Sequence, residues 1–135
     1  MRSLNVGEAV CVPVSAKVHW NHSGILARQG ERFLLATGNV VDWRDAWVEA
    51  SPDGQNDVPW VLDNKFARGF LRYPHAEWYA LVGAMDERLD TCFLVGRSVT
   101  FQAGHEGELC FFANDAPWAY YNNHGTLDLT ITRTG

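Results

Sequence analysis

The sequence predicts an all-β fold, an antiparallel β-sandwich or barrel with about eight strands in a single domain over residues 1–135. The first observation is a succession of short apolar or alternating runs separated by Gly, Pro, Asn and Asp. The second is that no run has the period of an amphipathic helix, and no internal repeat or low-complexity tract is present. The third is composition: 135 residues suffice for one domain and are few for two, and 47% hydrophobic and 13% aromatic residues provide a core.

Residues 9–18 open the predicted sheet. This run is rich in β-branched residues, which favour strands, and Pro13 within it indicates an edge strand or a bulge because proline donates no ladder hydrogen bond. Residues 19–24 are rich in turn formers and predict a break in the sheet. A second, short strand is expected over residues 25–27.

Residues 32–37 form a strongly apolar run after a tight hairpin turn at 28–31, so this strand is expected to be deeply buried. The strand continues through 38–43 with a bend at Gly38. Over residues 44–68 the chain shows no period of either kind and is interrupted by Asp, Asn, Gly and Pro. We expect a long irregular loop there, and loops of this length are usually functional.

The chain is expected to return to the sheet after this loop. Residues 85–90 are polar and predict one helical turn, and Gly96 divides two neighbouring apolar runs. The strands expected in this part of the chain are 69–73, 78–83, 92–96 and 98–101.

The end of the chain has the pattern strand, loop, strand. The apolar run 109–113 precedes a polar loop over 114–125, and alternation of apolar and polar residues resumes over 126–132.

The loop over 114–125 collects side-chain oxygens. Asp115, Asn122 and Asn123 can each aim a hard oxygen inward, and Gly125 can supply a left-handed turn that folds them together. Such oxygens suit Ca²⁺, which takes about 6–8 oxygen ligands and accepts backbone carbonyls among them. Asn and Asp are also ordinary turn formers, so the loop by itself leaves a plain turn as the alternative.

The net charge and the lack of a recognisable secretory signal or membrane span limit the expected partners and location of the protein. The formal net charge of −5 argues against binding to nucleic acid or an anionic membrane, because both need clustered Lys and Arg. No secretory signal follows Met1, and no run approaches the ~18 apolar residues of a membrane span. We therefore expect a cytoplasmic protein with no membrane insertion, with release by a non-classical route left open.

The three cysteines lie within apolar runs, at Cys11, Cys92 and Cys110, and their number is odd. This predicts buried thiols of strands in a reducing compartment rather than a disulfide. His19 and His22 are three residues apart in a predicted turn, which does not define a zinc site without a third ligand. Neither a Gly-x-Ser-x-Gly elbow nor a phosphate-binding Gly-rich motif is present.

The loop also carries a specific resemblance. Its pattern Asn-Asp-x-Pro-x-x-Tyr-x-Asn-Asn-x-Gly, residues 114–125, resembles the calcium- and sugar-binding loop of the PA-I galactophilic lectin family. Shorter pieces upstream are similar to this family in the same order, at 19–38, 51–54, 81–83 and 93–96. The resemblance implies the galactose-binding-like fold, a β-sandwich of the jelly-roll type.

The resemblance implies Ca²⁺ as a cofactor. Its ligands are expected to be the side chains of Asp115, Asn122 and Asn123 together with two backbone carbonyls, those of Ala119 and Asp42. The position of the last carbonyl follows from its spacing to the end of the third strand.

In the family, vicinal hydroxyls of galactose complete the calcium shell, and a His and a Gln flank the Pro-Asp of the long loop. Here Ser51 replaces the His, and the Gln is replaced by Gly or lies one residue later. Asp53 can still bond a hydroxyl, and Trp43 or Trp47, like the Trp of the closing loop, can offer an apolar face to a sugar ring. The expected carbohydrate-binding residues are Asp53, Asp115, Trp118, Asn122, Asn123 and His124.

The expected function is therefore calcium-dependent, non-catalytic binding of a carbohydrate, of galactose type or another glycan, with assembly into a homo-oligomer to raise avidity. The first alternative is a structural or protein-interaction module that has kept the fold and lost sugar binding. The second is a small hydrolase or a subunit accessory to one, in which Asp53 pairs with Asp115 or Asp42.

Overall fold

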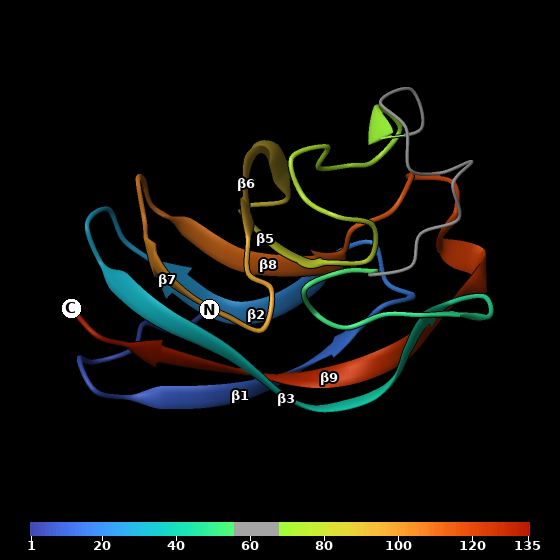
Figure 1. Cartoon of the computed structure of the whole chain (residues 1–135). Coiled ribbons are helices and arrows are strands. Elements are labelled where there is room, and N and C mark those ends of the chain that lie inside the picture. The colour runs from blue at the N-terminus through green and yellow to red at the C-terminus, as the bar shows by residue number, and fades with distance from the viewer. Residues whose placement is uncertain (56–67) are drawn as a thin grey trace.

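The computed structural model of the chain describes residues 1–55 and 68–135. Two antiparallel sheets lie face to face as a β-sandwich, which confirms the predicted fold class, with nine strands in the described residues rather than about eight (Figure 1). The strands are β1 Ala9–Ser15, β2 Asn21–Ala27, β3 Arg32–Asp45, β4 Val48–Glu49, β5 Leu81–Met85, β6 Arg88–Leu94, β7 Ser98–Gln102, β8 Gly107–Ala113 and β9 Asn123–Arg133, with a short 3₁₀ helix η1 at Tyr120–Asn122.

One sheet has the order β1-β9-β3-β4, with β7 also paired to β3, and the other has the order β2-β8-β5-β6. β1 lies at an edge of its sheet and pairs with β9 alone among the named strands, where Pro13 faces Asp128. The edge position predicted from Pro13 is therefore confirmed.

The main core lies between the sheets and is built by alternation. Phe33 and Leu35 of β3 face Leu109 and Phe111 of β8, and all four side chains are fully buried. A second, smaller cluster covers the outer side of the four-stranded sheet, where Phe112 packs with residues of the segment before β5. β8 is thus buried on both faces, which explains its continuous apolar run.

β3 is one strand, as predicted from the continuation of 32–37 through 38–43, and it ends two residues later than expected, at Asp45. Its pairing with β9 shifts between Gly38 and Val41, which confirms the bend at Gly38, and shifts again between Val41 and Arg44. These two bulges set the register at the end of the strand, so that Asp45 pairs with Asn123.

Two predicted elements after the long loop are wrong. Residues 69–73 form turns rather than a strand, and residues 85–90 form a hairpin turn rather than a helical one. In that hairpin, Asp86 and Glu87 have φ of 53° and 56°, the left-handed conformation that a two-residue hairpin requires. Part of the predicted loop at 44–68 is strand β4, and 56–67 lie outside the described residues.

Other boundaries moved by a few residues. β2 begins at Asn21, inside the predicted break at 19–24, and β5 begins three residues after the predicted start at Trp78. Cys110 is buried and Cys92 half-buried, but Cys11 is exposed because it lies on the outer face of an edge strand, which corrects the expectation of three buried thiols. All three cysteines are free.

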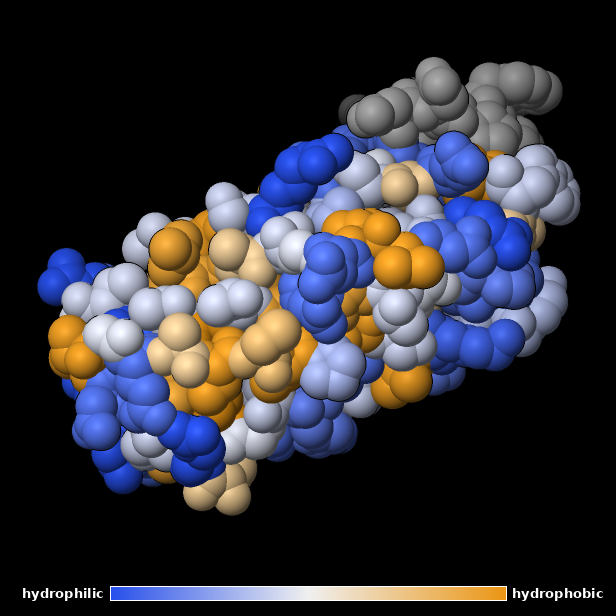
Figure 2. Space-filling model, turned by 90° about the horizontal axis from the view of Figure 1, so that it is seen from below, coloured by the Kyte–Doolittle hydropathy of each residue, from blue (hydrophilic) through white to orange (hydrophobic). Residues whose placement is uncertain are grey.

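The face seen from below in Figure 1 carries apolar residues among polar ones (Figure 2). Exposed apolar side chains of the five-stranded sheet include Leu34 and Val41 of β3. Among the described residues, no helix is long and apolar enough to span a membrane.

Candidate metal and ligand site

Three elements meet at one end of the sandwich: the residues after β8, the end of β3 and the start of β9. Asn114, the first residue after β8, is fully buried and fastens the neighbouring turn. Its Nδ2 donates to the carbonyls of Tyr73, Ala76 and Glu77 at 2.8, 3.2 and 3.1 Å, and its Oδ1 accepts from the Tyr73 N–H at 3.1 Å. The Asn of the Asn-Asp pair is therefore a structural residue, and the Asp is free to serve the site.

Tyr79 joins the three elements. Its side chain is fully buried, and its hydroxyl lies 2.5 Å from the Arg44 carbonyl of β3 and 3.0 Å from the backbone of His124 in β9. Its backbone N–H donates to the Asn114 carbonyl at 2.7 Å. Burial is the main reason that the pKa of Tyr79 is raised, so the hydroxyl stays protonated and holds the strand ends together.

Side-chain oxygens without hydrogen-bond donors gather at this junction. Asp115 and Asn123 are 1% and 0% exposed, and within the described parts of the chain neither Asp115 Oδ2 nor Asn123 Oδ1 accepts a hydrogen bond. The Asn123 Nδ2 donates to the Ala16 carbonyl at 3.1 Å, which fixes the direction of its Oδ1. Buried polar atoms are normally paired, so two unpaired acceptors in one place indicate a missing positive partner.

The Asn122 side chain completes the cluster. One end of its amide lies 2.7 Å from the Ala119 carbonyl and 3.2 Å from Asp45 Oδ1. With nitrogen at that end, the amide donates to both oxygens; with oxygen there, three oxygens converge as they do around a cation. With nitrogen at that end, the Asn122 amide is hydrogen-bonded to both oxygens, and rotation of the amide would turn its oxygen toward them instead.

Both carboxyl groups of the cluster have raised pKa values. Burial raises the pKa of Asp115 to about 7, and the neighbouring negative charge of Asp45 adds to the effect. The Ala116 N–H, 2.7 Å from Asp115 Oδ1, and the neighbouring Asn123 side chain oppose it. Burial also raises the pKa of Asp45. Among the described residues, no positive group offsets these costs for either carboxylate, so a cation between them would be favoured.

The donor set fits Ca²⁺. The oxygens available are carboxylate oxygens of Asp45 and Asp115, the Ala119 carbonyl, and the amide oxygens of Asn122 and Asn123. All are hard ligands, the two carboxylates balance the charge of a divalent cation, and the set leaves room within the usual total of about 6–8 oxygens. One to three further positions are thus open to a ligand or to water.

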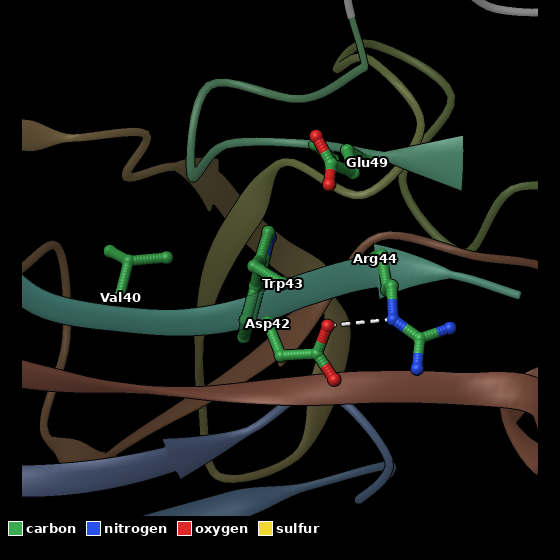
Figure 3. A pocket seen from close by; sticks show the side chains of 6 residues that line it. Val40, Asp42, Trp43, Arg44 and Glu49 are labelled. Atoms are coloured by element: carbon green, nitrogen blue, oxygen red, sulfur yellow. Dashed lines mark hydrogen bonds and ion pairs between the residues drawn. The ribbon is translucent and has the colours of Figure 1, made fainter. Parts of the chain in front are cut away.

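The structure places Asp45, not Asp42, at this cluster. The Asp42 carbonyl lies against Gly125, where a Cβ would come within 2.6 Å of it, and the Asp42 carboxylate accepts from Arg44 Nε at 2.6 Å (Figure 3). The side chains of both residues line a separate open pocket of about 200 Å³ on β3 and β4. The two bulges in β3 explain the difference, because they insert residues that a count from Gly38 does not include.

A largely apolar pocket of about 270 Å³ adjoins the cluster. One wall is formed by Phe70 and Trp118, whose rings meet edge to face with centroids 5.4 Å apart. Trp118 is 65% exposed, so its ring is a surface platform rather than part of the core. The pocket is lined by Asp45, Phe70, Trp78, Asp115, Ala116, Trp118, Ala119 and Asn122.

The remaining predicted sugar residues lie elsewhere. Asp53 accepts from the backbone N–H and the Nε of Arg97, both at 2.9 Å, and thereby holds the turn between β6 and β7. His124 follows the cluster on β9 but does not line the apolar pocket. Trp43 is buried and donates to the Tyr79 carbonyl at 3.0 Å, whereas Trp47 is 86% exposed and lies outside this pocket.

Sequence reasoning missed Asp45, Phe70 and Tyr79. An acidic residue three positions after Asp42 was visible, but nothing in the alternation revealed the two bulges that bring it to Asn123. Tyr79 was assigned to a strand, whereas it has a φ of 67° and bridges strands from a turn. Phe70 was likewise assigned to a strand that is not formed.

No family model matches the chain. No curated protein matches it either. A solved structure described as "EclA N-terminal domain; PllA-like lectin" is similar to this chain, with a TM-score of 0.65 and 17% sequence identity over 91% of this chain and 94% of that one. At this identity the likeness shows the fold alone, and the fold of the chain is that of a β-sandwich lectin domain.

Proposed function

We propose that the chain is a calcium-dependent carbohydrate-binding protein that acts without catalysis. The observation that carries this proposal is the convergence of Asp45, Asp115, the Ala119 carbonyl, Asn122 and Asn123, in which the buried Asp115 Oδ2 and Asn123 Oδ1 accept no hydrogen bond from the described residues. These residues would hold Ca²⁺, which would supply a positive centre for the hydroxyl oxygens of a ligand. The structural likeness to a lectin domain supports the carbohydrate-binding part of this proposal.

The neighbouring pocket has the two surfaces that a sugar needs. Its floor offers the open side of the oxygen cluster, where vicinal hydroxyls would complete the metal shell, and its wall offers the exposed ring of Trp118 for the apolar C–H face of the sugar. The volume of about 270 Å³ lies near the lower end of ligand pockets, which span roughly 300–1,000 Å³. A single terminal sugar residue fits this scale better than an extended chain.

Thermal unfolding tests the proposal directly. The full chain is unfolded in chelator, in Ca²⁺, and in Ca²⁺ with galactose or a glycan panel at millimolar concentration. A ligand at 100 times its dissociation constant stabilises the native state by about 2.7 kcal/mol, so we expect one increase with Ca²⁺ and a second that requires both Ca²⁺ and sugar. If Ca²⁺ leaves the midpoint of unfolding unchanged, the metal assignment is wrong. If Ca²⁺ raises the midpoint and no sugar raises it further, the proposal of sugar binding is wrong.

Two observations favour other functions. Asp53 is engaged with Arg97 and supplies no polar anchor to the pocket, which favours a module that keeps the metal as a structural element without sugar binding. Asp45 and Asp115 line one pocket with raised pKa values, an arrangement that also suits acid–base catalysis. Cleavage of chromogenic glycosides in chelator, lost in Asp115→Asn, would support the hydrolase and contradict the lectin.

Self-association and the cytoplasmic location stay predictions. Sedimentation of the full chain with and without Ca²⁺ measures the first, and an oligomer would raise avidity for a multivalent glycan.

A further inference from the structure

A second cluster of possible metal ligands lies on the outer face of the four-stranded sheet. His22 of β2 and Cys110 of β8 are directly paired across the two strands, and Glu108 precedes Cys110 by two residues and so lies on the same face. His22 Nδ1 is 2.8 Å from Glu108 Oε1 and 3.7 Å from Cys110 Sγ. The three ligand atoms all lie within 4.8 Å of one another.

The chemistry and spacing of these atoms suit zinc. Zn²⁺ binds thiolate sulfur, imidazole nitrogen and carboxylate oxygen at about 2.0–2.3 Å, which in a tetrahedron places neighbouring ligand atoms about 3.3–3.8 Å apart. The sulfur-to-nitrogen distance of 3.7 Å already falls in this range. The nitrogen-to-oxygen distance of 2.8 Å is that of a hydrogen bond and would open by less than about 1 Å on metal binding.

The groups around the cluster orient its ligands. Glu87 Oε1 lies 2.6 Å from His22 Nε2 and can keep a proton on that nitrogen. In the metal-free protein Nδ1 donates its proton to Glu108 Oε1, and loss of this proton would turn the Nδ1 lone pair toward a cation bound by Glu108 and Cys110. The Gly24 N–H donates to Glu108 Oε2 at 3.0 Å, which leaves Oε1 to face the imidazole. His22 is half exposed, so a cation can reach the site from solvent.

We propose that His22, Glu108 and Cys110 bind a divalent cation of the zinc class, with Glu87 as the group that positions the imidazole. The thiolate and imidazole distinguish this site from the all-oxygen cluster, since soft ligands select zinc over calcium. Seven residues separate Glu108 from Asp115, roughly 20 Å along an extended chain, so the two sites lie at different ends of β8. Binding would release the thiol proton of Cys110 and the Nδ1 proton of His22 to solvent, and the fourth position would be open to water.

Cobalt tests this assignment because a thiolate bound to Co²⁺ gives a charge-transfer band in the near ultraviolet. The full chain, reduced and kept in excess Ca²⁺ to fill the oxygen cluster, is titrated with Co²⁺ and then with Zn²⁺. We expect one Co²⁺ per chain, a charge-transfer band, and its loss as Zn²⁺ displaces Co²⁺. Absence of the band would mean that the cluster is only an ion-pair network and would overturn the proposal.

Matched variants locate the ligands. Cys110→Ser is expected to lose the band, whereas Cys92→Ser, which changes a half-buried thiol outside the cluster, retains it. Two further variants preserve side-chain size, so they test the site even if the cysteine variant fails to fold. Glu108→Gln should weaken Co²⁺ binding at least about tenfold, and Glu87→Gln should weaken it about 10- to 100-fold. A band that persists in Cys110→Ser, or one that Cys92→Ser removes, would contradict the assignment.

Discussion

Replacing Asp115 by asparagine is expected to stabilise the metal-free protein at alkaline pH and to abolish its response to Ca²⁺. The carboxyl group is 1% exposed, Oδ2 accepts no hydrogen bond, and burial together with the charge of Asp45 raises its pKa from 3.8 to about 7. At about 1.4 kcal/mol per pH unit, the charged form costs the folded state roughly 4 kcal/mol above pH 7. Asparagine keeps an oxygen for the Ala116 N–H and carries no charge, so that the cost of burying a charge and the repulsion by Asp45 are both removed.

The pH dependence of this effect has a definite sign. Because the pKa of Asp115 is higher in the folded than in the unfolded state, the folded state holds more protons between about pH 4 and pH 7. The contribution of this group to stability is therefore fully present below about pH 4 and is lost as the pH rises through about 7. The difference between Asp115→Asn and wild type should grow from near zero at about pH 4 to as much as roughly 4 kcal/mol at about pH 8.

Urea unfolding in chelator at about pH 5 and about pH 8 measures the difference, and repetition in excess Ca²⁺ measures the metal response. In Ca²⁺ the wild type should gain stability and the variant should not. Asp128→Asn is the control, because Asp128 is part of β9 away from the cluster and bonds Asn39 at the surface. If Asp115→Asn is less stable than wild type in chelator at about pH 8, the carboxylate is not an uncompensated charge and the electrostatic argument for a cation fails.

Three further substitutions follow from the site. Tyr79→Phe removes the hydroxyl that contacts Arg44 and His124. The free energy of unfolding in urea should fall by about 1–3 kcal/mol, and calorimetry should show weaker Ca²⁺ binding. Unchanged stability would show that other contacts hold the strand ends. Trp118→Ala should weaken sugar binding roughly tenfold, about 1.4 kcal/mol, and leave the stabilisation by Ca²⁺ intact. Trp47→Ala is the control and should change neither sugar binding nor the response to Ca²⁺. If the two variants bind sugar equally well, Trp118 is not part of the sugar site. Gly125→Ala should lower the free energy of unfolding by roughly 2 kcal/mol, because the φ of Gly125 is +117° and the new Cβ would lie 2.6 Å from the Asp42 carbonyl. Gly104→Ala is the control, since its Cβ would meet nothing within 4 Å. Similar thermal midpoints for the two variants would contradict this prediction.

The local sequence pattern was sufficient to predict structure where the conformation depends on residues within the same segment. The run over 109–113 was correctly predicted as strand, and Pro13 correctly placed its strand at an edge, because alternation and the missing N–H act within the strand itself. The oxygens of Asp115, Asn122 and Asn123 were also proposed from one continuous loop, and the structure brings them together.

Pattern failed where the fold depends on contacts between distant segments. Residues 78–80 are apolar and read as strand, but they are buried as a turn because Asn114 and Trp43 take their backbone groups. Asp45 was missed because strand register depends on two bulges, and a bulge leaves no trace in apolar alternation. The partners of Asp53 were unpredictable in the same way, since Arg97 reaches it from another hairpin.

The buried guanidinium of Arg72 lies near the oxygen cluster, but its hydrogen bonds go to other groups, and this explains why it does not neutralise the two carboxylates. Arg72 donates its backbone N–H to the Asp115 carbonyl, but its guanidinium is directed to the His19 carbonyl and the Tyr120 hydroxyl at 2.7 and 2.8 Å. The same group lies 3.8 Å above the Phe112 ring, on the outer face of the four-stranded sheet.

Arg44, the basic residue beside Asp45, is likewise engaged with Asp42 and the Ala46 carbonyl. Neither arginine can neutralise Asp45 and Asp115 without losing these partners, and an unpaired buried guanidinium is costly. A charge of +2 supplied from solution would relieve both carboxylates at once, and two carboxylates neutralise one such ion. Within the described residues, the neighbouring arginines are thus directed away from the two carboxylates, and this is the electrostatic arrangement that the proposed divalent metal would require.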